Sequence, residues 1–115
     1  MIASLNVGAR DHIAKAYYLK DSSEEIREQS RSLGCEILNG MVNLPELKLV
    51  GVALIPLDEG QYIGGEGADY TGILRPEVAG LILEIGNIQD DTRYALLTST
   101  QTKSRLPAVI QDAIT

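Results

Sequence analysis

The sequence contains no phenylalanine and no tryptophan, and its aromatic residues are five tyrosines. The core must therefore be built from leucine, isoleucine, valine and alanine, without the large rings that anchor many small domains. A single cysteine excludes an internal disulfide, and one histidine with one cysteine supplies too few ligands for an ordinary zinc site. We expect neither a metal nor a cofactor, and we expect self-association to complete the thin core.

Basic residues are in the minority, since ten lysines and arginines face sixteen aspartates and glutamates, for a formal net charge of -6. An acidic chain repels a phosphate backbone, so no nucleic-acid partner is expected. Long apolar runs are also missing, because no stretch approaches the roughly 18 residues that span a bilayer. Residues 1–6 lack the basic and apolar regions of a signal peptide. We therefore expect no membrane partner and a cytoplasmic location.

The length of 115 residues and the hydrophobic content of 44% are typical of one globular domain, which we expect to cover residues 1–115. Two segments have helical patterns. Ser22 and Glu25 form a capping box at the start of the first, and Gly34 follows it as a left-handed stop. Ser104 is expected to cap the second, which carries an apolar stripe. The predicted helices cover about 23–33 and 104–114.

The other patterned segments are predicted to be strands. The first two are expected to pair as a hairpin, and so are the last two. Residues 47–57 are apolar on both faces, which is typical of a central strand, although Pro56 limits hydrogen-bond donation near its end. The expected fold class is α+β, a mostly antiparallel sheet with the two helices packed on one face. The predicted strands cover 2–7, 12–20, 36–43, 47–57, 80–88 and 93–100.

Two residue types that often carry catalysis occur once each. His12 follows Asp11, but neighbouring residues on a strand point to opposite faces, so the aspartate is poorly placed to orient the imidazole. Cys35 follows the predicted end of the first helix, where the helix dipole disfavours a thiolate, and we predict a buried packing residue. We therefore predict no catalytic residues, which favours a protein that is not an enzyme.

One segment has the composition of a ligand-binding loop. Residues 64–72 are rich in glycine, whose backbone N–H groups can converge on an anion, and arginine is the side chain best suited to phosphate. Glu66 and Asp69 oppose an anion, and a loop whose glycines only permit tight turns is the plainer interpretation. The candidate ligand-binding residues are Arg10, Tyr62, Gly64, Gly65, Gly67, Tyr70, Arg75 and Arg105.

Two functions are open at this point. The missing catalytic set, the acidic charge and the ring-poor core favour a non-catalytic homo-oligomeric binding or assembly module, whose partner is another copy of the chain. The alternative is a protein that binds an anionic small molecule, such as a nucleotide or a phosphorylated metabolite, at a subunit interface. Such a protein would act as a sensor, a sequestering protein or a modest enzyme.

Overall fold

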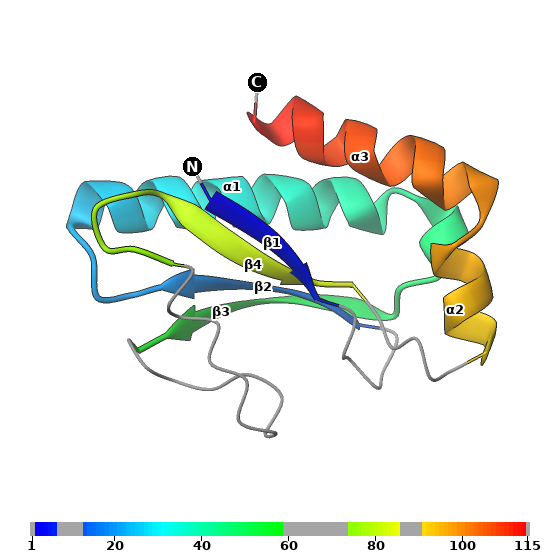
Figure 1. The fold of residues 1–115 in the computed structure, drawn as a ribbon, viewed down its shortest axis with the longest axis horizontal. Coiled ribbons are helices and arrows are strands. Elements are labelled where there is room, and N and C mark those ends of the chain that lie inside the picture. The colour runs from blue at the N-terminus through cyan, green and yellow to red at the C-terminus, as the bar shows by residue number, and fades with distance from the viewer. Residues whose placement is uncertain (1, 7–12, 59–73, 86–90, 115) are drawn as a thin grey trace.

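The computed structural model describes residues 2–6, 13–58, 74–85 and 91–114 (Figure 1). A sheet and helices are both present, so the predicted α+β class is confirmed. In chain order the elements are β1 (Ile2–Asn6), β2 (Ile13–Leu19), α1 (Glu24–Val42), the short 3-10 helix η1 (Pro45–Leu47), β3 (Gly51–Leu57), β4 (Gly80–Glu84), α2 (Asp91–Leu97) and α3 (Thr100–Ile114).

The four described strands form one mixed sheet in the order β1-β4-β2-β3. β1 runs parallel to β4 and β2 runs parallel to β3, whereas β2 and β4 are antiparallel. The prediction of a mostly antiparallel sheet is therefore wrong. The hairpin expected between the first two strands is also wrong, because β4 lies between them. Strand pairing depends on contacts between distant segments, and the α1 crossover allows β2 and β3 to run parallel.

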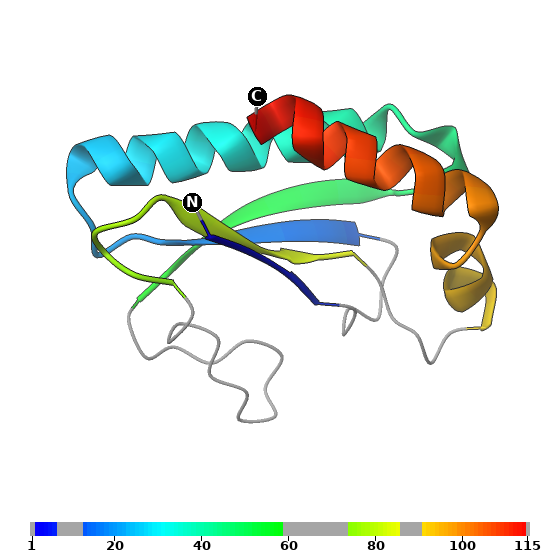
Figure 2. The ribbon, with the colours of Figure 1, turned by 45° about the horizontal axis from the view of Figure 1, so that its top comes forward.

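The two long helices lie on the same side of the sheet, as predicted, with α1 along the strands and α3 packed against α1 (Figure 2). Alternation along the strands directs Ala14 and Ala16 of β2 and Leu81 and Leu83 of β4 toward α1. The core between sheet and helices is therefore built from small and aliphatic side chains. The helices contribute Leu33, Ile37, Leu38, Met41 and Leu106 to this buried cluster.

The first helix ends much later than predicted. Its capping residue is Ser23 rather than Ser22, and it continues to Val42, so the strand predicted over 36–43 is wrong. Buried residues recur at helical spacing from Ser30 to Met41, which keeps one face of α1 against the sheet. Gly34 is consequently an interior, buried residue of the helix and does not end it.

A helix replaces the strand predicted over 93–100, and with it the second predicted hairpin is wrong. α3 begins before Ser104, because Ser99 provides the cap: its Oγ accepts a hydrogen bond from the N–H of Thr102 at 3.2 Å. The Thr102 hydroxyl donates to the carbonyl oxygen of Leu96 at 2.7 Å. Serine and threonine side chains that bond to nearby backbone favour such turns, and their alternation resembles a strand pattern in sequence.

Other boundaries differ less from the predictions. The strand expected over 47–57 begins at Gly51, because η1 ends at Leu47 and residues 48–50 connect it to β3, and β4 ends at Glu84. Pro107 lies inside α3 and not in its first turn. In the ranges given above, no helix combines the length and the apolar character that crossing a bilayer requires.

We expect Ser30→Ala to lower the free energy of unfolding by about 1–3 kcal/mol. Ser30 is buried on α1, and its Oγ accepts a hydrogen bond at 3.0 Å from the N–H of Gly80, the first residue of β4. Alanine leaves that buried N–H without its acceptor. Urea unfolding at one protein concentration measures the loss, and Ser32→Ala, at an exposed position of the same helix, is the control. Equal effects of the two substitutions would contradict this role.

Candidate functional site

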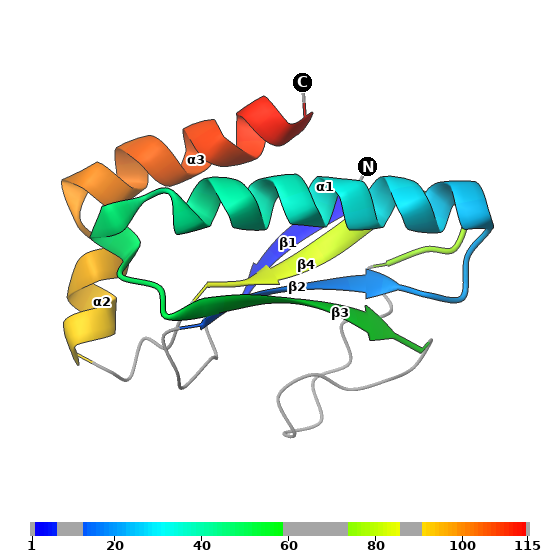
Figure 3. The ribbon, with the colours of Figure 1, turned by 180° about the vertical axis from the view of Figure 1, so that it is seen from behind.

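β3 lies at an edge of the sheet, whereas the sequence predicts a central strand over 47–57. In the described sheet its one neighbour is β2 (Figure 3). The seven residues of β3, Gly51–Leu57, include no polar or charged side chain, and of these Leu57 alone is buried. Among the described residues, β3 therefore has the composition of a covered strand but lies at an edge with one neighbouring strand, which corrects the predicted placement.

The hydrogen bonds of β3 show which backbone groups point away from the sheet. The N–H of Lys20 donates to the carbonyl oxygen of Leu57 at 2.9 Å, so Leu57 directs its backbone groups toward β2. The direction of the backbone N–H and C=O groups alternates from one residue to the next along a strand. The backbone groups of Val52, Leu54 and Pro56 therefore point toward the open edge. Pro56 has no N–H to donate, and an outward position at an edge is where a sheet tolerates proline.

Exposed aliphatic side chains extend this edge at one end. Val50, just before β3, is 78% exposed, Val52 is 36% exposed, and Val42, the last residue of α1, is 52% exposed. α1 ends and β3 begins at the same end of the molecule (Figure 3). Grouped apolar residues mark interaction sites, whereas single exposed ones need no explanation. We refer to Val50 and residues 52–56 as the edge surface.

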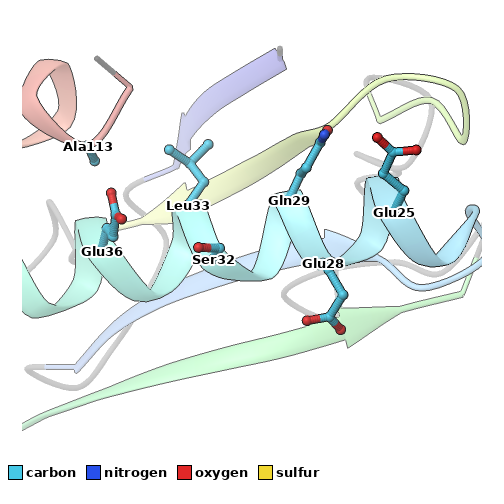
Figure 4. Close-up of a pocket in the computed structure, with 7 residues that line it drawn as sticks. All are labelled: Glu25, Glu28, Gln29, Ser32, Leu33, Glu36 and Ala113. Carbon is cyan, nitrogen blue, oxygen red and sulfur yellow. The ribbon is translucent and has the colours of Figure 1, made fainter.

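Ion pairs border the edge surface. Lys20 Nζ lies 2.9 Å from Asp58 Oδ1, just after β3, and the hydrogen bond to this carboxylate raises the pKa of Lys20 above its ordinary value. Glu28 points toward the side of α1 on which β3 lies (Figure 4). Arg31 Nη1 lies 2.8 Å from its Oε1, and this hydrogen bond raises the pKa of Arg31. The apolar strand is thus flanked by solvated charges that are already compensated.

A buried carboxylate lies on the sheet face turned away from α1. Glu84 of β4 is 5% exposed, and its register partner on β2 is Lys15. Opposite charges directly across an antiparallel pair attract each other, so these two residues form a polar position in an apolar layer. Within the part of the chain that the structure describes, no group of three metal-ligating side chains is present. The apolar layer consists of Tyr17, Leu19, Ile55, Leu57, Leu74 and Ile82.

A shallow groove lies on α1 beside the end of α3 (Figure 4). Its lining includes three glutamates and no basic residue, and this negative charge repels the anionic ligands that the alternative function requires. The groove therefore does not support a nucleotide or a phosphorylated metabolite. The lining residues are Glu25, Glu28, Gln29, Ser32, Leu33, Glu36 and Ala113.

The predicted ligand-binding residues fall into two groups. Arg75 and Arg105 are described and exposed, but they lie at opposite ends of the sheet. Arg75 accepts a hydrogen bond at 3.2 Å from the N–H of Val78 in the turn before β4, and Arg105 lies 3.2 Å from Glu46 in η1, before β3. Because β4 runs opposite to β2 and β3, the structure does not bring these two arginines together. The residues outside the described ranges are Arg10, Tyr62, Gly64, Gly65, Gly67 and Tyr70.

The two residues considered for catalysis do not define a site. His12 lies outside the described residues. Cys35 is exposed near the middle of α1, so its prediction as a buried packing residue is wrong. The reason is the longer helix, which places residue 35 beside, and not on, the face that Gly34 presents to the sheet.

The edge surface is the feature that the sequence analysis missed. Apolar residues on both faces do not distinguish a central strand from an edge strand that a partner covers. Pro56 was the available signal, since proline inside an apolar run indicates an edge position.

Comparison with known proteins adds no guide to function. No protein-family profile matches the chain, and no curated protein matches it in sequence. Function is therefore inferred from the edge surface, where the composition of the strand and its position in the sheet disagree.

Proposed function

We propose that the chain is a non-catalytic assembly module that forms a homodimer through β3. The observation that carries the proposal is the position of an entirely apolar strand at the edge of the sheet. An open edge exposes a row of backbone donors and acceptors, and pairing with another strand satisfies them while burying apolar surface. Proteins that keep such an edge free usually place charged residues on it, and β3 carries none.

A second copy is the partner that the charge distribution favours. The chain has a net charge of -6, so two copies repel each other unless they meet at a neutral surface. Between Leu49 and Leu57 no residue is charged. Lys48 precedes this stretch, and Asp58, which follows it, is paired with Lys20. The core contains no phenylalanine or tryptophan, and pairing two such edges buries additional aliphatic surface by extending the sheet.

The solution mass of the full chain tests the proposal. We expect sedimentation and light scattering to give twice the chain mass of 12.4 kDa at micromolar concentration. We also expect the thermal midpoint to rise with protein concentration, because dimerisation and folding are linked by mass action. A mass of 12.4 kDa up to about 100 µM protein would refute the proposal. A thermal midpoint that rises with an added nucleotide while the mass stays monomeric would favour the small-molecule alternative.

A further inference from the structure

We infer that two copies pair their β3 strands antiparallel about a two-fold axis at Ala53. This inference rests on the proposed function and specifies its geometry. A two-fold axis perpendicular to a sheet joins two identical edge strands antiparallel, and the same surface then serves both copies. The dimer becomes one continuous sheet, in which both copies of α1 lie on the same face.

The outward backbone groups restrict the register of this pair. In an antiparallel ladder, residues that face each other's edge exchange both N–H···O=C bonds. Val52 and Leu54 each offer an N–H and a C=O to the open edge, whereas Pro56 offers a C=O alone. An axis at Ala53 places Val52 of each copy opposite Leu54 of the other copy. The N–H and C=O groups of these two pairs then all form backbone hydrogen bonds within the two β3 strands.

The neighbouring registers are less favourable. An axis at Leu54 places Val52 opposite the second copy's proline 56, so the Val52 carbonyl faces a ring and has no donor. An axis at Val52 needs Val50 in the ladder, but β3 begins at Gly51 and Val50 lies in a bend. An axis at Ile55 places Leu54 opposite the same proline. The proline therefore selects Ala53 as the centre.

Side-chain size supports the same register. A residue on the axis at Ala53 faces its own copy as a non-hydrogen-bonded pair, where the two Cα atoms approach to about 4.5 Å. Alanine is small enough for this close approach. The next pair on the same face of the sheet as Ala53 is Gly51 with Ile55 of the second copy, so a residue without a side chain lies opposite a large one. On the face that carries α1, Val52 of each copy lies opposite Leu54 of the other copy. The paired β3 strands contain no charged residue.

Disulfide trapping tests the register in the full chain. In a Cys35→Ser background, we expect Ala53→Cys to give a covalent dimer under mild oxidation, because a Cα separation of about 4.5 Å allows a disulfide. The matched variant is Leu54→Cys in the same background. Its two copies would lie about 8 Å apart at a rise of about 3.4 Å per residue, beyond the reach of a disulfide.

The outcomes separate this inference from the proposed function. Trapping by Ala53→Cys and not by Leu54→Cys supports the register. Trapping by Leu54→Cys alone, or equally by both, overturns the axis at Ala53 while the β3 joint stands. No trapping by either variant, although the chain has a dimeric mass, overturns the axis at Ala53 and leaves the β3 joint to the Val52→Pro variant. A monomeric mass of the unsubstituted chain refutes the proposed function itself, whatever the cysteine variants do.

Discussion

Replacing Gly34 by leucine is expected to lower the free energy of unfolding by about 3 kcal/mol. A Cβ at this position would lie 2.7 Å from Leu54 Cδ1, 3.3 Å from Leu81 Cδ2 and 3.6 Å from Ala16 Cβ. These atoms belong to β3, β4 and β2, so a side chain at Gly34 would meet three strands at once. A leucine there forces the helix away from the sheet and opens the core on both sides of the contact.

Gly34→Ala is the matched comparison and is expected to cost much less. The nearest atom to its Cβ is the tip of the Leu54 side chain, which can move, and alanine is favoured over glycine inside a helix by up to about 1 kcal/mol. Urea unfolding at equal protein concentration measures both variants. If the two substitutions lowered the free energy of unfolding equally, the requirement for glycine at position 34 would lie in backbone conformation. The close contact between α1 and the strands would then not be its cause.

Val52→Pro is expected to abolish dimerisation while the protomer stays folded. The N–H of Val52 points to the open edge, so proline removes no bond to β2, and its ring blocks the approach of a second strand. We expect the dimer dissociation constant to rise by at least about 100-fold, which corresponds to about 2.7 kcal/mol. Sedimentation equilibrium measures the dissociation constant, and circular dichroism reports the retained fold.

Ala53→Pro is the control one residue away. The N–H of Ala53 points toward β2, so the substitution removes a ladder bond within the protomer and is expected to cost about 3 kcal/mol of stability or more. The opposite outcome, in which Val52→Pro unfolds the protein and Ala53→Pro only dissociates it, would show that the assigned backbone directions are reversed. A Val52→Pro variant as dimeric as the unsubstituted chain would remove β3 from the interface.

Local patterns predicted the elements better than their pairing. The serine cap and early glutamates located the start of α1 within one residue, because the signal and the structure are both local. β1 and β4 pair across most of the chain, and nothing in either segment indicates a parallel partner. The mostly antiparallel prediction failed for this reason, although the α+β class followed from the kinds of elements present.

Gly34 and residues 98–102 show why some local signals were misleading. A glycine after a leucine has the same sequence signature whether it ends a helix or lets the helix approach a sheet, and the difference is a contact with β3 and β4. Alternating serine and threonine resembles an exposed strand. In the structure, Ser99 and Thr102 bond to nearby backbone and join two helices.

The candidate site was less predictable than the fold. Arginine chemistry suits an anion, but a binding site also needs the arginines to lie close together. Of the two described arginines, Arg105 pairs with Glu46 and lies far from Arg75. The edge surface depends on strand order, which no single segment contains. Val50 and Val52 are ordinary strand residues until β3 is known to have one neighbour in the described sheet.

The strand order also has a consequence for synthesis on the ribosome. β1 emerges first, yet its neighbour β4 begins at Gly80, so the growing chain carries β1 unpaired while β2, α1 and β3 come together. Non-local pairing of this kind is slow, and because β4 is the last of the four described strands to emerge, the sheet is completed only when β4 docks between β1 and β2. Until β4 docks, the hydrogen-bonding side of β2 that β4 later covers is open, so β2 of a nascent chain can pair with a strand of a chain on a neighbouring ribosome.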